Sequence, residues 1–294
     1  MQWQDFTSHN IETPSGNLFA YIGGQGAPLV LLHGFPQTHL MWERVANELC
    51  KTHRVICFDL PGYGASDAPA DIDAASKRAM AQQIVDAMYT LGYSQFAVSG
   101  HDRGGRVAYR MAFDHPDVVT KLAVLDILPT LEYWQNMDHA FAMKIYHWAF
   151  LAQPEPLPET LIGGAPQYYI DHTLQSWTAK QDLSCFHKHA LDAYRKQACD
   201  PRTRKAMCDD YRAGESIDVE HDKEDYGNRK ISCPTIVLWG SAGIASDAAT
   251  PLNTWRKWCD DVQGEAIASG HFIPEENPED TAVALKRFLH SGKD

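Results

Sequence analysis

The sequence predicts an α/β fold in which helices flank a mostly parallel central sheet and a helical cap is inserted into the core. Short apolar runs alternate with amphipathic segments up to about residue 128, and this alternation is typical of βαβ units. Comparable runs are missing from residues 129–225 and return after residue 226. We therefore expect residues 1–128 and 226–294 to form the core and residues 129–225 to form the cap.

Apolar periodicity places the elements of the core in order along the chain. Buried strands are expected at residues 29–32, 55–58, 96–98, 122–125, 236–239 and 265–267. Helices are expected over residues 76–91, 104–115 and 278–290. Within the cap, the proline-rich residues 154–158 are expected to form a loop, and the acidic residues 215–225 a solvated face.

Length and charge limit the possible classes of function. The chain has 294 residues, which suits one large domain or a core with an insertion. Its net charge of −12, from 38 acidic and 26 basic side chains, makes nucleic acid and anionic membranes poor partners. At first sight the same charge also disfavours a small anionic substrate.

Cysteine usage and hydropathy indicate where the protein resides. No apolar run approaches the roughly 18 residues of a membrane span, and the first residues lack the basic and apolar regions of a signal peptide. The seven cysteines show no CxxC spacing. This pattern predicts reduced thiols, a cytoplasmic location and no structural zinc.

One pentapeptide carries the strongest chemical signal. Gly100-His101-Asp102-Arg103-Gly104 follows the third buried strand and precedes a helix. Its spacing is that of the G-x-S-x-G nucleophile elbow, with Asp102 in the place of serine. Glycines flank such a nucleophile because the strand-to-helix turn is sharp, and the helix N-terminus favours a carboxylate. An ordinary turn capped by Asp102 would show the same five residues.

Other motifs agree with an elbow. His33-Gly34-Phe35-Pro36 follows an early strand, residues 59–66 read DLPGYGAS after the next one, and Gly270-His271-Phe272 follows the last strand. Together these motifs resemble the α/β-hydrolase fold over almost the whole core. The resemblance implies that His271 is the base and that the Phe35 loop contributes an oxyanion-hole amide, with the amide of Arg103 as the second donor.

The acid that orients His271 has two candidates. Many hydrolases carry it after the next-to-last strand, but residues 239–246 contain no carboxylate, and Asp247 is the first to follow. Asp126 instead ends the strand after the elbow helix. We favour Asp126, although an aspartate at a strand end is often only a turn residue.

An aspartate nucleophile restricts the reaction. Attack by Asp102 on an acyl group would give an anhydride, whereas attack on a saturated carbon gives an alkyl ester that water, activated by His271, can cleave. The sequence therefore favours either displacement of halide or opening of an epoxide. Haloalkane dehalogenases and epoxide hydrolases typically have tryptophan after the nucleophile, and this chain has Arg103 there. Arg106 follows on the same helix face, and two guanidiniums suit a carboxylate.

The motif Asp102-Arg103-x-x-Arg106, together with His-Gly-Phe-Pro, closely resembles that of the fluoroacetate dehalogenases. The resemblance runs nearly end to end. It implies that Arg103 and Arg106 hold a substrate carboxylate and that His147-Trp148 bind the departing halide. The third halide donor of that family is a cap tyrosine. Tyr211 is its best match, and the nearby alternatives are Tyr194 and Tyr226.

The resulting hypothesis is hydrolysis of fluoroacetate and other 2-haloacetates to glycolate and halide through an ester of Asp102. It requires water but no metal or organic cofactor, and the resemblance implies a homodimer. An epoxide hydrolase with the same triad is the alternative, because Tyr146, Tyr168 or Tyr211 could protonate an alkoxide. A ligand receptor of the same fold is a third possibility, which the complete set of Asp102, Asp126 and His271 disfavours.

Overall fold

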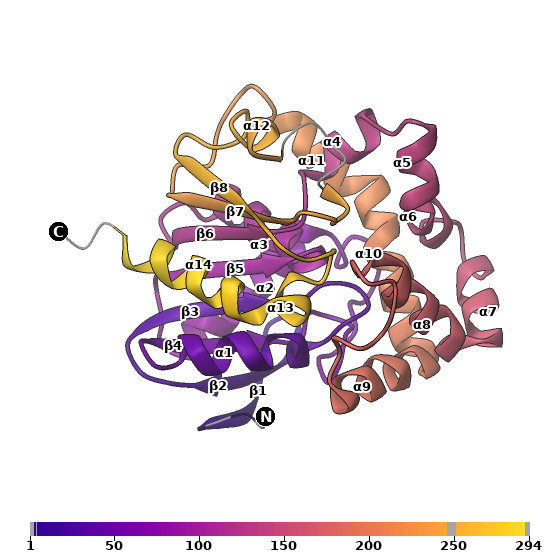
Figure 1. The fold of residues 1–294 in the computed structure, drawn as a ribbon, viewed down its shortest axis with the longest axis horizontal. Helices are drawn as coiled ribbons and strands as arrows, with labels where there is room; N and C mark the ends of the chain where they lie inside the picture. The colour runs from indigo at the N-terminus through magenta and orange to yellow at the C-terminus, as the bar shows by residue number, and fades with distance from the viewer. Residues whose placement is uncertain (1–2, 4, 246–250, 292–294) are drawn as a thin grey trace.

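The computed structural model describes residue 3, residues 5–245 and residues 251–291, and within them one twisted sheet forms the centre of the molecule (Figure 1). Its strand order is β1-β2-β4-β3-β5-β6-β7-β8. From β4 to β8 all neighbouring strands are parallel, whereas β1 and β2 pair antiparallel. The strands are β1 (Phe6–Thr13), β2 (Gly16–Gly23), β3 (Ala27–Leu32), β4 (His53–Phe58), β5 (Phe96–His101), β6 (Val119–Leu125), β7 (Thr235–Gly240) and β8 (Val262–Ile267).

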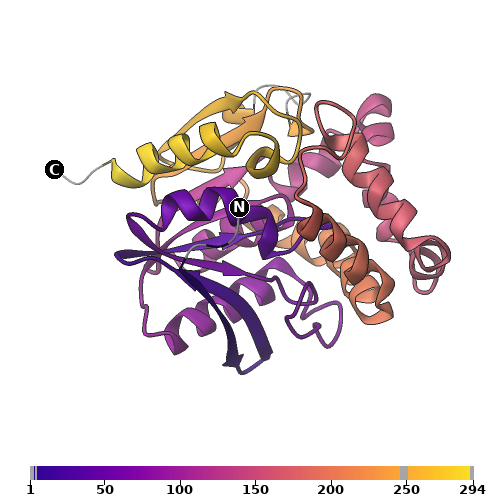
Figure 2. The same cartoon turned by 60° about the horizontal axis from the view of Figure 1, so that its bottom comes forward.

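Helices cover both faces of this sheet. On one face α1 packs against α14, and on the other α2 packs against α3 (Figures 1 and 2). The elements of the core outside the sheet are η1 (His39–Trp42), α1 (Glu43–Leu49), α2 (Lys77–Thr90), α3 (Arg103–Asp114), α12 (Pro251–Trp255), α13 (Ile273–Glu276) and α14 (Pro278–His290). The α/β fold with a mostly parallel sheet is thus confirmed, because strands buried on both faces need a helical layer on each side.

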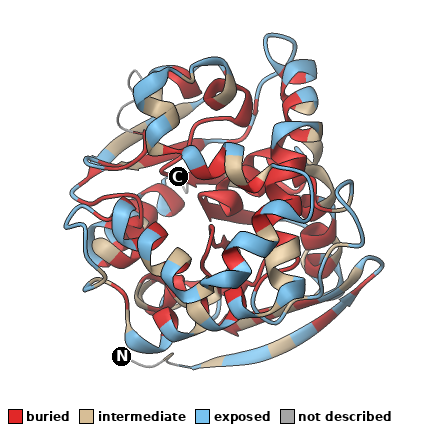
Figure 3. Ribbon diagram, turned by 90° about the vertical axis from the view of Figure 1, so that its right-hand side faces the viewer, coloured by how far each residue is buried: buried red, intermediate tan, exposed pale blue. Residues whose placement is uncertain are grey.

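Between β6 and β7 the described chain contains helices and no strand. These helices lie together at one end of the sheet (Figure 1), and each of them except α5 contains both buried residues and more exposed ones (Figure 3). They are α4 (Thr130–Gln135), α5 (His139–Lys144), α6 (Tyr146–Leu151), α7 (Leu157–Gly164), α8 (Pro166–Trp177), α9 (Lys188–Cys199), α10 (Pro201–Glu215) and α11 (Ile217–Asp225).

The acidic segment at the end of this helical region differs from the prediction of a solvated face. Asp218, Asp222 and Asp225 lie at helical spacing on α11 and are buried. Asp218 accepts a hydrogen bond from the amide of Lys77 at 2.8 Å, and Asp222 accepts one from the Tyr109 hydroxyl at 2.9 Å. Asp225 pairs with arginines of the core. The prediction was wrong for these three aspartates, because buried carboxylates are tolerated where partners compensate their charge.

Three smaller features also differ from the prediction. The β1–β2 hairpin was not expected, because β1 is an edge strand with few apolar residues. Helix α1 was not expected either. The loop predicted at residues 154–158 ends early, since α7 begins at Leu157 and contains Pro158 in its first turn, where proline is tolerated.

Two chain-wide features concern the thiols and the helices. All seven cysteines are free in the structure. Among the described residues, none of the helices has both the length and the hydropathy that crossing a membrane would require.

Candidate active site

The predicted nucleophile lies at the sharp turn between β5 and α3. Asp102 has φ 47° and ψ −116°, a strained conformation for a residue other than glycine. The flanking glycines are required by close backbone approaches. A Cβ on Gly100 would lie 2.3 Å from the carbonyl oxygen of Gly104, and one on Gly104 would lie 2.4 Å from that of His33. The sequence therefore forms an elbow and not an ordinary capped turn.

The Asp102 carboxylate is buried beside hydrogen-bond donors and positive charge. Its Oδ1 accepts a hydrogen bond from the Phe35 amide at 2.8 Å, and its Oδ2 lies 3.8 Å from Nε2 of His271. Burial alone would raise the pKa of Asp102, but His271, His101 and Arg103 outweigh this effect and lower the pKa below its ordinary value. Asp102 is therefore ionised at neutral pH, as a nucleophile must be.

His271 is oriented by Asp126. Nδ1 of His271 lies 2.6 Å from Oδ2 of Asp126. The Asp126 carboxylate in turn accepts hydrogen bonds from the amides of Gly240 and Ile244, each at 3.0 Å. Asp247, the other candidate acid, lies outside the described residues. The arrangement leaves Nε2 of His271 facing Asp102, with no hydrogen-bond partner in the described structure.

The two arginines after the elbow are both fully buried but have different partners. Nε and Nη2 of Arg103 donate to the Asp210 carboxylate at 2.9 and 2.7 Å. Burial disfavours the Arg103 charge, but Asp210 outweighs it and raises the pKa of Arg103. Arg106 has neutral partners instead. Its Nη1 donates to the Leu128 carbonyl at 3.0 Å and to the Thr130 hydroxyl at 3.1 Å.

Aromatic rings cover both guanidiniums. The Tyr211 ring lies 4.2 Å from the Arg103 guanidinium carbon, and the Trp148 ring lies 4.4 Å from that of Arg106. Cation–π contacts of this kind help to keep a charge inside a desolvated site. They also bring the predicted halide donors Trp148 and Tyr211 next to the predicted carboxylate donors.

His147 and Tyr211 complete the cluster. The His147 ring stacks on that of Phe35 at 6.4 Å and lies edge-on to Tyr211 at 5.6 Å. Burial lowers the pKa of His147 to about 3, so its imidazole is neutral, and burial keeps the pKa of the Tyr211 phenol well above its ordinary value. The alternative tyrosines are occupied elsewhere. The Tyr194 hydroxyl donates to Glu275 at 3.2 Å, and Tyr226 is partly exposed beside Trp258.

Several polar atoms of this cluster are buried without a hydrogen-bond partner among the described residues. They are Arg103 Nη1, Arg106 Nε, His147 Nδ1, Tyr211 Oη and His271 Nε2. Each such group costs about 1–3 kcal/mol when it stays unpaired, so native proteins rarely retain them without a reason. These unpaired polar atoms lie around the ionised carboxylate of Asp102. Their position indicates that a small polar ligand binds here and supplies the missing hydrogen-bond partners.

Sequence reasoning missed two residues that shape the site. Asp210 fixes Arg103, and no local pattern distinguishes it from Asp209 beside it in α10. The Trp177 ring lies 4.3 Å from that of His147, and the Trp177 carbonyl accepts a hydrogen bond from the His271 amide at 2.9 Å. Trp177 thereby contacts both His147 of the helical region and the loop that carries His271, and its aromatic character was the available signal.

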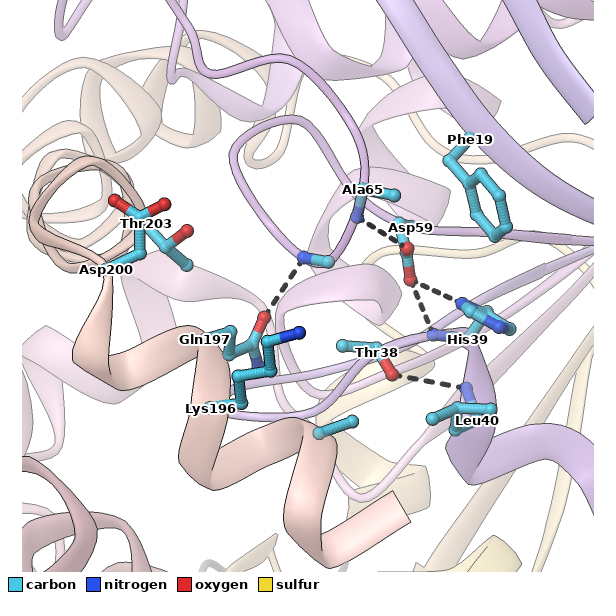
Figure 4. A pocket seen from close by; sticks show the side chains of 12 residues that line it. Phe19, Thr38, His39, Leu40, Asp59, Ala65, Lys196, Gln197, Asp200 and Thr203 are labelled. Atoms are coloured by element: carbon cyan, nitrogen blue, oxygen red, sulfur yellow. Dashed lines mark hydrogen bonds and ion pairs between the residues drawn. The ribbon is translucent and has the colours of Figure 1, made fainter. Parts of the chain in front are cut away.

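A glutamine of the helical region also supports the Phe35 loop. Gln197 on α9 donates from Nε2 to the carbonyls of Pro36 and Gln37, at 2.6 and 3.1 Å, and accepts from the Gly64 amide at 3.0 Å. It lines the pocket of about 310 Å³ shown in Figure 4, which contains none of the predicted site residues. In the same pocket wall Asp59 holds the amides of His39 and Ala65. The motif that begins at Asp59 therefore supports the loops beside the site.

Comparison with known proteins gives concordant results. Residues 27–278 match the family model of the alpha/beta hydrolase fold. The chain is 40% identical to a fluoroacetate dehalogenase from Burkholderia sp, with 99% of this chain and 96% of that protein covered. It is 29% identical to a soluble epoxide hydrolase from Corynebacterium sp. (strain C12), over 95% of this chain and 96% of that one. A solved structure from Nostoc sp PCC 7120, a proposed alpha/beta hydrolase, has a TM-score of 0.96 and 46% identity, with 99% of this chain and 100% of that chain covered.

Proposed function

Because the chain belongs to the alpha/beta hydrolase fold family, we propose that it is a haloacetate dehalogenase, which hydrolyses fluoroacetate and other 2-haloacetates to glycolate and halide. One observation carries the proposal. Unpaired donors of two kinds, guanidinium and neutral, surround the ionised Asp102. A 2-haloacetate presents a carboxylate for the first kind and a departing halide for the second. The 40% identity to fluoroacetate dehalogenase agrees with this assignment.

Binding begins with the substrate carboxylate. Arg106 supplies most of the net positive charge, because its hydrogen-bond partners, Leu128 and Thr130, are neutral. Arg103 is already compensated by Asp210 and contributes a fixed direction through Nη1, which has no hydrogen-bond partner in the described part of the chain. Together they orient the α-carbon of the substrate toward Asp102, and orientation of this kind supplies a large part of the rate enhancement of enzymes.

The first chemical step is in-line displacement. An Asp102 oxygen forms a bond to the α-carbon while the carbon–halogen bond breaks and its electron pair leaves with the halide. Donors from His147, Trp148 and Tyr211 stabilise the halide as its charge develops. Stabilisation that appears only in the transition state raises kcat, whereas equal binding of substrate and transition state does not.

The second step hydrolyses the ester. A water activated by Nε2 of His271 attacks the carboxyl carbon of Asp102, and the imidazolium that forms is stabilised by Asp126. Negative charge then develops on the Asp102 oxygen that already accepts the Phe35 amide bond at 2.8 Å, so Phe35 serves as an oxyanion donor. Collapse returns the carboxylate and releases glycolate, whose hydroxyl oxygen comes from Asp102 and whose proton comes from His271.

Single turnover in ¹⁸O-labelled water tests this route. With enzyme in excess over fluoroacetate, glycolate should be unlabelled and one label should remain on Asp102. Peptide mass spectrometry locates that label. If the first-turnover glycolate carries solvent oxygen, water attacks the substrate directly and the ester mechanism is wrong.

The epoxide hydrolase alternative depends on tyrosines that protonate an alkoxide. Tyr211 is buried within the site, but Tyr146 and Tyr168 are 41% and 72% exposed. Release of fluoride from fluoroacetate without turnover of styrene oxide would support the dehalogenase, and the reverse pattern would support the epoxide hydrolase.

The remaining features of the proposal concern specificity and assembly. Residues 129–225 act as the cap that supplies the halide donors, and the protein is a cytoplasmic homodimer, as the family resemblance implies. A fluoride-electrode comparison of fluoroacetate, chloroacetate and 2-chloropropionate ranks the substrates. Light scattering coupled to size exclusion measures the oligomeric state, and a monomer would contradict the proposed assembly.

A further inference from the structure

A cluster of metal-binding residue types lies where the helical region meets the core, and it shares no residue with the proposed active site. Its members are Glu43, His187 and His189. Glu43 is the first residue of α1 in the core, His187 directly precedes α9 without a capping hydrogen bond from its side chain, and His189 lies in the first turn of that helix. Two segments thus contribute to one cluster, one in the core and one in the cap region, and Glu43 and His187 are 144 positions apart in the sequence.

The separations within the cluster suit a small tetrahedral ion. Oε2 of Glu43 lies 3.0 Å from Nδ1 of His187 and 3.4 Å from Nε2 of His189. Bonds of 2.0–2.1 Å to Zn²⁺ place tetrahedral ligands about 3.3 Å apart, so both Glu43–histidine separations already match such an edge. All three ligand atoms lie within 4.8 Å of one another.

Burial within the cluster is graded. The Glu43 side chain is 4% exposed, that of His187 is 34% exposed and that of His189 is 48% exposed. Glu43 therefore offers a buried carboxylate, and the exposed side of the two histidines is open to water. A site with three protein ligands and one water is common for zinc.

The surrounding charges do not compete for Glu43. No lysine or arginine pairs with Glu43 anywhere in the described part of the chain, although Arg44 is its neighbour. Nη2 of Arg44 donates instead to the carbonyls of Cys185 and Glu275. A buried carboxylate whose side-chain partners are imidazoles can share a divalent cation with them.

We propose that Glu43, His187 and His189 bind one divalent transition-metal ion, with Zn²⁺ as the reference ligand and water in the fourth position. Two imidazoles and one carboxylate favour Zn²⁺, Ni²⁺ or Cu²⁺ over Mg²⁺ or Ca²⁺, which prefer oxygen ligands. This cluster contains no cysteine, so its ligand atoms are imidazole nitrogens and a carboxylate oxygen. Because the ligands come from α1 and α9, the bound ion restrains the cap region against the core.

Isothermal titration of the chelator-treated full chain, without a polyhistidine tag, tests the proposal. Zn²⁺ should bind with a stoichiometry of one and raise the Tm of the protein, because a ligand that binds only the folded state stabilises it. Mg²⁺ at the same concentration should leave the Tm unchanged. Absence of stoichiometric Zn²⁺ binding would overturn the proposal.

Matched variants identify the ligands. His189→Asn alters an exposed side chain and should fold normally, while its Zn²⁺ affinity should fall by at least about tenfold, since losing even an outer partner of a metal ligand costs about 10–100-fold. His172→Asn removes another exposed cap imidazole, stacked on Tyr168, and should bind as the parent does. Cu²⁺ electron paramagnetic resonance should show two coupled nitrogens in the parent and one in His189→Asn. Equal affinity of both variants for Zn²⁺ would place the ion elsewhere.

Discussion

Replacing Tyr211 by phenylalanine should separate activity from stability. The Tyr211 hydroxyl is buried and unpaired in the described structure, while its ring covers Arg103 and packs edge-on to Phe35 at 5.4 Å. Phenylalanine keeps the ring and removes only the donor that we assign to the halide. The substitution should therefore disturb the chemistry and leave the packing intact.

The magnitude follows from the value of a hydrogen bond to a charged group. Such a bond contributes about 1.5–3 kcal/mol, and each 1.4 kcal/mol corresponds to roughly tenfold in rate, so kcat for fluoroacetate should fall by roughly 10- to 150-fold. The free energy of unfolding should stay the same or rise, because an unpaired buried hydroxyl is lost. For chloroacetate the fall should be smaller, since chloride is larger and accepts weaker hydrogen bonds than fluoride.

Tyr194→Phe is the matched control. Its hydroxyl is equally buried but donates to Glu275 at 3.2 Å, so its loss should lower the free energy of unfolding by about 1 kcal/mol and leave kcat unchanged. A fluoride electrode measures kcat, and urea unfolding measures stability. Our assignment of the halide donor is refuted if Tyr211→Phe retains kcat within about twofold, or if Tyr194→Phe is the slower enzyme.

Three further predictions follow from the same geometry. The variant His271→Gln should still displace halide but should fail to hydrolyse the ester. Intact-mass spectrometry after incubation with fluoroacetate should therefore find one carboxymethyl group per chain. An unmodified chain would contradict the assignment of His271 as the base. Burial raises the pKa of Glu275 from 4.5 to about 8 in the folded state, so its contribution to stability is present below pH 4.5 and is lost as the pH rises through 8. Glu275→Gln should therefore reduce the loss of Tm between pH 6 and pH 9, and an unchanged loss would argue against this origin. Raising the ionic strength from about 20 to 200 mM should raise kcat/KM for fluoroacetate, because salt screens the repulsion between an anion and a chain of net charge −12. A decrease in kcat/KM would mean that the local attraction of the site for the anion dominates.

The parts of the fold that the sequence predicted depend on local patterns. Most of the parallel strands are apolar runs, because both of their faces are buried, whereas the edge strand β8 is only partly buried. Each predicted run from Leu29 onward lies within a strand. The elbow at Asp102 is equally local, since its glycines are required by backbone contacts inside a single turn. The edge strand β1 has one side open to solvent and a mostly polar sequence, so it contains no apolar run from which a strand could be predicted.

The features that could not be predicted depend on partners that are distant in the sequence. Asp210 belongs with Arg103 because the chain folds back across 107 positions. Asp218, Asp222 and Asp225 recur at helical spacing, which is compatible with either a solvated face or a buried one. The choice was decided by Lys77 and Arg110, which α2 and α3 present to α11. The composition gives the number of these charged residues, whereas the partner of each one is known only from the folded structure.

The pairing of charged side chains also explains how a protein with a net negative charge can bind an anionic substrate. The charge of −12 belongs to the whole chain, whereas the field in the site is set by two arginines. Arg106 has no acidic hydrogen-bond partner among the described residues, and Arg103 is compensated by Asp210. In the proposed reaction negative charge moves from Asp102 onto the halide. A cationic residue at the halide position would also bind the substrate and the released halide tightly, and would slow product release. Burial lowers the pKa of His147 to about 3, so the halide meets neutral donors whose effect grows as the carbon–halogen bond breaks.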